Sequence, residues 1–127
     1  MTGIADDAGR ALMRLTIVSE GVPEGVNVHV WIDTGFTGEL VFPKDIIRQL
    51  ELIKSGSVDA ILADGTPTEL DTFSCRILWF EREKHLEVIA NEGETPLLGV
   101  GLLLGKELRI DYTNLTLSLM PAAKASP

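Results

Sequence analysis

Hydrophobic and polar residues alternate along much of this chain. A clear example covers residues 26–32, where valine or isoleucine occupies every second position. A period of two is typical of a β-strand that buries one face, so we predict a strand there. Similar short runs predict further strands that begin at Leu15 and cover residues 39–42, 58–62, 66–79, 86–90, 108–112 and 115–119.

A hairpin signal joins two of these runs. Asp64-Gly65 lies between an alternating run that ends near Leu62 and one that begins at Thr66. An Asp-Gly pair in this setting predicts a type I′ turn, because both positions of that turn need positive φ. Pro67 lacks an N–H, and its place early in the returning arm predicts an edge strand.

Two segments favour helices. After Pro43, residues 44–50 carry hydrophobic side chains at helical spacing, and residues 100–104 are long enough for one or two helical turns. Turn signals otherwise recur about every 8–12 residues, which is typical of small sandwiches and barrels. We therefore predict an all-β fold, a small closed barrel or a sandwich, with eight or nine short strands and one or two short helices.

The length of 127 residues predicts one domain. We place the folded domain at residues 14–120. Residues 1–13 are expected to form a flexible N-terminal extension, and residues 121–127 a flexible C-terminal tail.

Composition excludes several classes of function. The formal charge of −8 argues against a nucleic-acid partner, which needs clustered basic residues. Hydrophobic residues make up 45% of the chain, enough to fill a core and too many for a disordered protein. Cys75 is the single cysteine, so no intrachain disulfide or paired-cysteine zinc site can form. Its parity with Phe73 and Ile77 predicts core packing, and we expect no metal and no cofactor.

Targeting signals are absent from the pattern. The apolar run at residues 97–104 is too short to span a membrane, which takes about 20 residues, and glycines interrupt it. Residues 1–11 lack the basic and then apolar order of a secretory signal. We expect a cytoplasmic protein without a membrane partner.

One acidic residue breaks the hydrophobic pattern. Asp33 follows directly on the predicted strand at residues 26–32 and begins the sequence Asp33-Thr34-Gly35. Taken alone, this tripeptide is most simply a turn, because its residue types are common in turns. A carboxylate on a loop behind a hydrophobic strand is also a suitable setting for catalysis.

Further segments, in a fixed order along the chain, favour the catalytic interpretation of Asp33 over the plain turn. The sequence WIDTGFTGEL at residues 31–40 is followed by VFP, then by ADGT at residues 63–66 and by LLG at residues 97–99. In this order and spacing the chain resembles the retropepsin-like aspartic proteases, especially their small prokaryotic members. The resemblance covers about residues 15–119 and implies a small closed barrel of the acid protease type.

The resemblance implies a role for each matched residue. Asp33 would be the catalytic residue, Thr34 would bond across a twofold axis, and Gly35 would present its backbone to a peptide. The turn at residues 63–66 would be the tip of a flap. Substrate contacts would come from Phe36, Thr37, Ala63, Asp64, Gly65 and Thr66, and support beneath the loop from Leu97, Leu98 and Gly99.

The chemistry requires two carboxylates. Hydrolysis of a peptide bond needs a base that activates water and an acid that protonates the leaving nitrogen, and two carboxyls that share one proton supply both. The chain has one Asp-Thr-Gly sequence, so the resemblance implies an aspartic endopeptidase that acts as a homodimer on peptide or protein substrates.

Two alternatives remain open. Val100 stands where retroviral enzymes carry an arginine, Phe36 replaces a small residue, and Thr37 replaces an acidic one. These differences suit a catalytically weak or inactive module of the same fold that acts in protein binding. The chain can also be a domain of a larger polypeptide whose partner lobe lies elsewhere.

Overall fold

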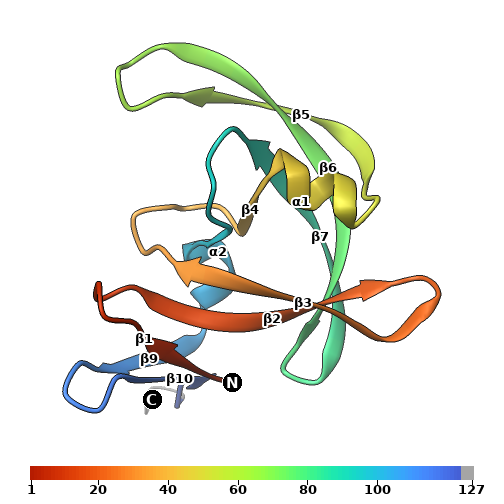
Figure 1. Cartoon of the computed structure of the whole chain (residues 1–127). Coiled ribbons are helices and arrows are strands. Elements are labelled where there is room, and N and C mark those ends of the chain that lie inside the picture. Colours follow the sequence, from red (N-terminus) through yellow and green to blue (C-terminus); the bar gives the residue numbers. More distant parts are fainter. Residues whose placement is uncertain (124–127) are drawn as a thin grey trace.

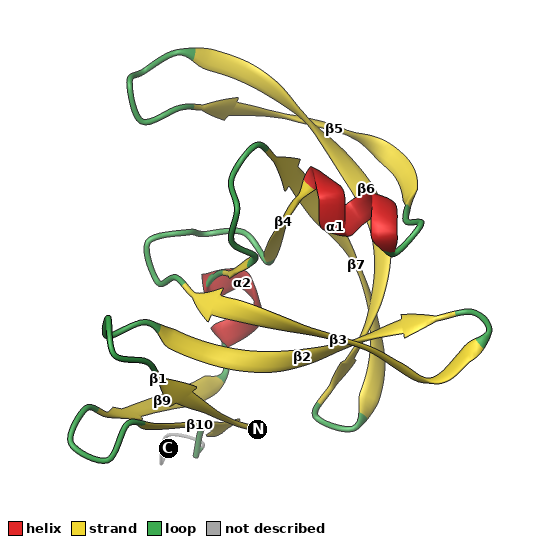
Figure 2. Ribbon diagram, viewed as in Figure 1, coloured by secondary structure: helices red, strands yellow, loops and turns green. Residues whose placement is uncertain are grey.

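The computed structural model describes residues 1–123 and consists mainly of β-strands (Figures 1 and 2). Two short helices, α1 (Lys44–Gln49) and α2 (Val100–Leu103), confirm the helices predicted at residues 44–50 and 100–104. The strands are β1 (Thr2–Ala5), β2 (Ala11–Ser19), β3 (Val22–Ile32), β4 (Leu40–Pro43), β5 (Ile53–Ile61), β6 (Pro67–Trp79), β7 (Arg82–Asn91), β8 (Leu97–Leu98), β9 (Lys106–Asp111) and β10 (Thr116–Pro121).

The strands form one sheet that closes on itself. Their order is β5-β6-β7-β4-β8-β3-β2-β1-β10-β9, and an additional pairing of Ile17 with Ile77 joins β2 to β6. Six strands from β6 to β2 therefore make a ring, which agrees with the predicted all-β class. β5 extends from one side of the ring, and β1, β10 and β9 extend from the other.

The ring encloses the hydrophobic core. The alternating positions of each strand supply it, as the period of two predicts. Fully buried side chains include Leu15, Val30, Leu40, Phe42, Ile77, Val88 and Leu98. Burying a side chain of this size contributes roughly 1.5–3 kcal/mol, so the ring is the stable part of the molecule.

The predicted N-terminal extension is instead part of the sheet. β1 pairs with both β2 and β10, and the N-terminal amine donates to Leu119 O at 2.7 Å. β2 begins at Ala11, four residues before the predicted start, and Ala5, Ala11 and Met13 are buried. The alternating pattern of β1 is hard to detect in the sequence, because its small residues have a weak preference for strands.

The C-terminal boundary also differs from the prediction. Pro121 is the last residue of β10 and pairs with Lys106, and the Ala122 N–H donates to Gly105 O at 3.0 Å. The predicted tail at residues 121–127 therefore begins inside the sheet. Its last part, residues 124–127, lies outside the described residues.

The hairpin between β5 and β6 forms where Asp64-Gly65 predicts it, but with a different turn. The Gly65 N–H donates to Leu62 O at 2.8 Å, and the Leu62 N–H donates to Thr66 O at 2.9 Å. Gly65 has φ +86°, whereas Asp64 is not among the residues with positive φ. A single left-handed glycine fits a type I turn with a bulge, so the predicted type I′ turn is wrong.

The prediction of an edge strand from Pro67 is also wrong for β6 as a whole. β6 lies between β5 and β7, but its pairing with β7 begins only at Thr72. Pro67 pairs with Ile61 of β5 and has no partner on its other side among residues 1–123. The missing N–H is thus tolerated in the part of β6 that has one neighbour. Within residues 1–123, no helix has the length and apolar content that crossing a membrane requires.

Candidate active site

The site is built where β8 inserts between β3 and β4. β8 runs parallel to β3, with Trp31 opposite Leu97, and antiparallel to β4, with Leu40 opposite Leu98. Residues 33–39, which we call the Asp33 loop, connect β3 to β4 (Figure 1). Two segments about 65 residues apart in the sequence meet here.

Backbone hydrogen bonds fix the Asp33 loop to the segment that follows β8. The Asp33 N–H donates to Leu98 O at 2.9 Å at the start of the loop. Farther along, Phe36 O accepts from the Val100 N–H at 2.8 Å, and Gly38 O accepts from the Gly101 N–H at 2.9 Å. These bonds hold both ends of the loop on the buried strand β8 and on α2, so the position of Asp33 is set by the core.

The Asp33 carboxylate is half-buried and turned toward its own loop. Its Oδ1 accepts a hydrogen bond from the Gly35 N–H at 2.9 Å, and Asp33 O accepts one from the Phe36 N–H at 3.2 Å. Thr34, Gly35 and Thr37 are more exposed. A carboxylate oriented by a backbone N–H at the end of a buried strand can exchange protons with a molecule bound above it.

Phe36 lies beneath the loop. A Cβ atom built on Gly38 would lie 2.5 Å from the Phe36 ring, and one on Gly99 would lie 2.4 Å from the ring and 2.3 Å from Gly38 O. The ring therefore lies against both glycines, in a place where other residues do not fit. The ring thus supports the loop, and the predicted contact of Phe36 with a substrate stays a prediction.

Trp31 is a site residue that the sequence reading missed. It precedes Asp33 by two positions, so it lies on the same face of β3, and it stands next to Leu97 of β8. Its side chain is 37% exposed, and the Arg10 guanidinium lies 5.8 Å from the ring centre. The sequence feature that could have indicated Trp31 is a tryptophan at a solvent-facing position of an alternating strand.

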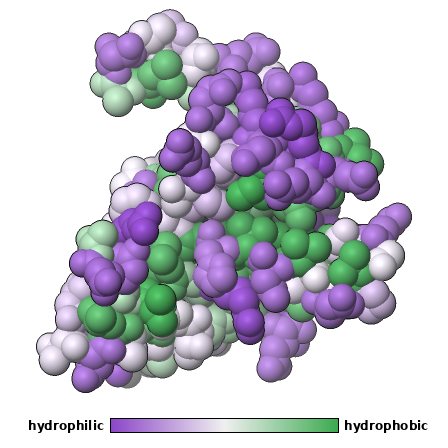
Figure 3. All heavy atoms as spheres, in the orientation of Figure 1, coloured by the Kyte–Doolittle hydropathy of each residue, from purple (hydrophilic) through white to green (hydrophobic). Residues whose placement is uncertain are grey.

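The β5–β6 hairpin rises above the Asp33 loop. In Figure 1 its tip lies on the same side of the molecule as the loop, and Figure 3 shows a hollow beneath this overhang. The four predicted tip residues at 63–66 are all exposed. Asp64 Oδ1 accepts from the Thr66 N–H at 2.9 Å, and bonds from the Thr66 hydroxyl and N–H hold the pKa of Asp64 below its ordinary value.

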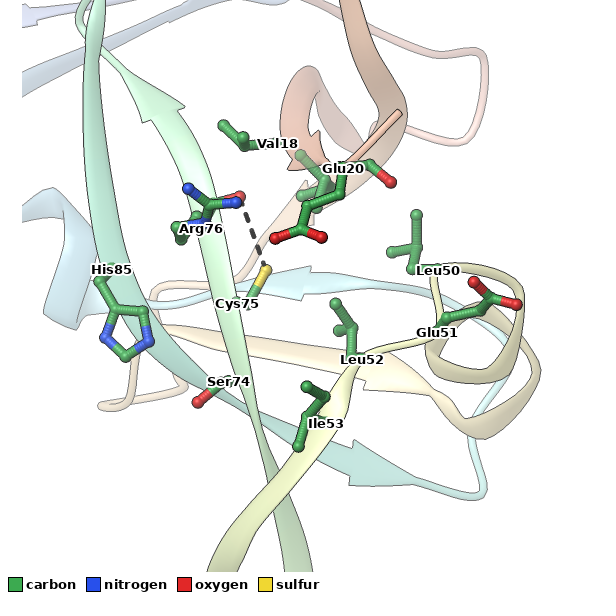
Figure 4. Close-up of a pocket in the computed structure, with 12 residues that line it drawn as sticks. Val18, Glu20, Leu50, Glu51, Leu52, Ile53, Ser74, Cys75, Arg76 and His85 are labelled. Atoms are coloured by element: carbon green, nitrogen blue, oxygen red, sulfur yellow. Dashed lines mark hydrogen bonds between the residues drawn. The ribbon is translucent and has the colours of Figure 1, made fainter. Parts of the chain in front are cut away.

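A separate cavity of about 390 Å³ lies away from this site, between the end of β2, the residues after α1, and β6 (Figure 4). Cys75 borders it, with Sγ 4.0 Å from Arg76 O. Burial raises the pKa of the Cys75 thiol to about 11, so the thiol stays protonated at neutral pH and is a poor nucleophile. This agrees with the core role predicted for Cys75.

Comparison with solved structures identifies the fold. The crystal structure of a retropepsin-like aspartic protease from Rickettsia conorii aligns with a TM-score of 0.65 and 16% identity, over 94% of this chain and 88% of that chain. The EIAV protease in complex with the inhibitor HBY-793 aligns with a TM-score of 0.55 and 18% identity, over 74% of this chain and 85% of that chain. The solution structure of the simian foamy virus (mac) protease aligns with a TM-score of 0.52 and 15% identity, over 72% of this chain and 90% of that chain.

Comparisons of sequence alone find no relative of this chain. No family model matches the chain, and no curated protein matches it significantly. At such low identity the structural likeness shows the fold, which is that of the retropepsin-like aspartic proteases. The residues that the resemblance assigned to catalysis thus lie on a matching scaffold.

Proposed function

We propose that this retropepsin-like chain is an aspartic endopeptidase that acts as a homodimer, with Asp33 from each copy forming the catalytic pair. The observation that carries the proposal is the fixed position of Asp33. Its loop is bonded at both ends to the buried β8–α2 segment while the carboxylate remains half-exposed.

The need for a second copy follows from the chemistry. One carboxylate must act as base toward water while another donates a proton to the leaving nitrogen. Two carboxyls about 3 Å apart cannot both ionise, so they hold one proton between them and meet both needs. The chain has one Asp-Thr-Gly sequence, and a twofold axis beside Asp33 would supply the second carboxylate. Thr34, exposed beside Asp33, would then meet its copy across the axis.

The substrate would be an extended peptide between the Asp33 loop and the β5–β6 hairpin. The hairpin offers backbone groups near Gly65, and Gly35 offers backbone beside the catalytic residue. The exposed Trp31 and the half-buried Leu97 provide an apolar surface near Asp33 that suits a hydrophobic side chain of the peptide. Activity should be greatest at mildly acidic pH, where the pair retains one proton.

The test is peptide cleavage by Asp33→Asn. This variant keeps the shape of the side chain but cannot ionise, so cleavage of a diverse peptide library should fall at least about 10³-fold while the fold is preserved. Asp7→Asn removes the same charge from an exposed turn and serves as the matched control, with unchanged activity. Cleavage retained by Asp33→Asn would refute the proposal.

Mixing tests whether both carboxylates are needed. With a ninefold excess of Asp33→Asn, random exchange leaves roughly one tenth of the wild-type chains paired with another wild-type chain, and activity should fall in proportion. Peptide binding without cleavage by the wild-type protein would instead support the alternative of a binding module.

A further inference from the structure

The ring of strands has a gap along one edge of β6. β5 pairs with β6 as far as Ser74, and β2 pairs with β6 only at Ile77. Within residues 1–123, Cys75 and Arg76 between these points have no strand partner on this edge. The cavity of about 390 Å³ beside Cys75 lies at this gap (Figure 4). Ligand pockets span about 300–1,000 Å³, so the gap has room for a small molecule.

The floor and one wall of the cavity are apolar. Ile17 and Cys75 are buried, and Leu50 and Leu52, in the segment after α1, are half-buried. The Leu52 N–H donates to Ile47 O at 3.2 Å, and this bond closes the end of α1 and fixes the segment that follows. The lining is thus held by the core and by α1, and it suits an apolar group.

The charged groups of the lining are unevenly distributed. Arg76 forms an ion pair with Glu83 of β7 at 3.5 Å, and His85 lies opposite Arg76 on β7. Glu20, which follows β2, forms no ion pair among residues 1–123, and its side chain is directed into the space between β6 and the residues after α1 (Figure 4). Glu51 at the rim is also without an ion-pair partner in the described part of the chain. The unpaired charge of the lining is therefore negative, and it complements a cation.

We propose that this cavity is a second binding site, separate from Asp33, for a small molecule with an apolar group and one positively charged nitrogen, and that its occupant controls the β5–β6 hairpin. The apolar group lies against Leu50 and Leu52, and the cationic nitrogen lies beside Glu20. The site itself does not depend on the proposed function, whereas its effect on peptide cleavage rests on it.

Control of the hairpin follows from where the cavity lies. Ile53 and Ser74 line it, and they are the pair of the β5–β6 ladder nearest to the ring. Beyond this pair the register shifts between Lys54 and Gly56, and an irregularity of this kind bends a strand. An occupant that contacts both this pair and Ile17 joins the base of the hairpin to the ring. It therefore favours one position of the hairpin over the others, which is what control requires.

Binding is tested with three probes of the same shape. Tryptamine carries an indole ring and an ammonium group, tryptophol has a hydroxyl in its place, and indole-3-acetate has a carboxylate. In a titration of the full chain followed by amide chemical shifts, tryptamine should bind with a Kd of roughly 1 mM. Tryptophol should bind about fivefold more weakly, and indole-3-acetate more weakly still. Indole-3-acetate that binds as tightly as tryptamine would overturn the cationic class of ligand.

The positions of the shifts test the location. Tryptamine should move the amide signals of residues 17–20, 50–53 and 74–76, which line the cavity. Asp33→Asn should bind tryptamine as tightly as the wild type does, because the cavity is separate from the Asp33 loop. Shifts confined to residues 31–37 would place the amine at the candidate active site and overturn the proposal.

Two variants with matched controls test the recognition. Glu20→Gln removes the carboxylate and should weaken tryptamine binding about fivefold, whereas Glu24→Gln, also exposed but outside the lining, should not. Ile53→Lys replaces a side chain that is 76% exposed and adds a competing ammonium group, so it should weaken binding by at least the same factor. Ile61→Lys, at a position 78% exposed at the other end of β5, should bind normally. Unchanged binding in both Glu20→Gln and Ile53→Lys would refute the site.

Amide hydrogen exchange tests the control of the hairpin without an activity assay. Saturating tryptamine should slow exchange at residues 53–60 about threefold or more, because the base of the hairpin is then joined to the ring. Exchange in the β1–β2 turn at residues 6–10 should not change. If tryptamine fills the cavity and exchange at residues 53–60 stays the same, control of the hairpin is refuted.

The outcomes separate the site from the proposed function. Saturating tryptamine should lower peptide cleavage by the wild-type protein about threefold, and it should not do so in Ile53→Lys. If tryptamine binds and slows exchange while the wild-type protein cleaves no peptide, the site stands and the proposed function fails. If the wild-type protein cleaves peptides but binds no tryptamine up to about 10 mM, the site is refuted and the proposed function stands.

Discussion

The Asp33 loop and the β5–β6 hairpin face the same hollow but are built in opposite ways. The loop rests on Leu98, which is fully buried, and on backbone bonds to the segment behind it. The hairpin has nine residues in β5, of which eight are exposed, and its tip at residues 63–66 is exposed throughout. Its main partner is its own second arm, since β7 joins β6 only from Thr72 onward.

This contrast separates two tasks. In the proposed enzyme, placing the Asp33 carboxylate against its copy would require a position held to a fraction of an ångström, and a loop bonded to a buried strand suits that. Admitting a peptide would require an element that opens at low cost, and the outer part of the hairpin suits that, because residues 53–66 contribute no side chain to the core. Substitutions in the two regions should therefore differ in the size and in the kind of their effects.

Truncation of a leucine beneath the Asp33 loop should have the largest effect on stability. Leu98→Ala removes a fully buried side chain and should lower the free energy of unfolding by about 2–5 kcal/mol in urea denaturation. Ile61→Ala in the hairpin is the matched control: the side chain is 78% exposed, so the change should stay within about 0.5 kcal/mol. Equal losses for the two variants would show that the hairpin is as well packed as the loop.

A backbone change at the hairpin tip should have an intermediate effect. Gly65 has φ +86° with open space around it, so Gly65→Ala should cost about 1 kcal/mol through backbone strain alone. Gly9→Ala matches it in the β1–β2 turn, where φ is +79° and the space is also open. Both variants should lose similar stability in urea, but Gly65→Ala alone should change KM for peptide cleavage. A KM change of the same size in Gly9→Ala would remove the role of the tip.

The smallest of the three effects is expected from acid, which should weaken the turn at the hairpin tip. The pKa of Asp64 is lowered by the bonds from Thr66, so its contribution to the turn is present above the ordinary pKa of 3.8 and is lost as the pH falls below it. Amide hydrogen exchange at residues 63–66, corrected for intrinsic rates, should speed up below that pH. Asp64→Ala should remove this dependence, whereas exchange of the Asp33 loop should not follow it. A pH dependence that persists in Asp64→Ala would assign it to another group.

The sequence predicted much of the ring of strands. Alternation placed β3, β7 and the later part of β6, and Asp64-Gly65 placed the hairpin. It missed β1, whose small residues carry little pattern, and β8, which has two residues and no room for a period. The type of turn was also wrong, because Leu62 pairs with Thr66 and leaves three residues in the loop, and loop length selects the turn type.

The candidate site shows the same division. The order of motifs along the chain predicted Asp33, the tip at residues 63–66 and residues 97–99 as site residues, and their roles stay predictions. The support role of Phe36 and the exposed surface of Trp31 beside Leu97 did not, since both depend on which segments the sheet brings together.

By itself, the sequence determined the class of fold and the place of Asp33-Thr34-Gly35 directly after a strand. Only the tertiary structure decided that β8 lies under the Asp33 loop, that Phe36 fills the space left by two glycines, and that β9 is an open edge. The physical reason is that alternation and turn chemistry act over a few residues. Pairing between distant strands is decided by the burial of all of them at once.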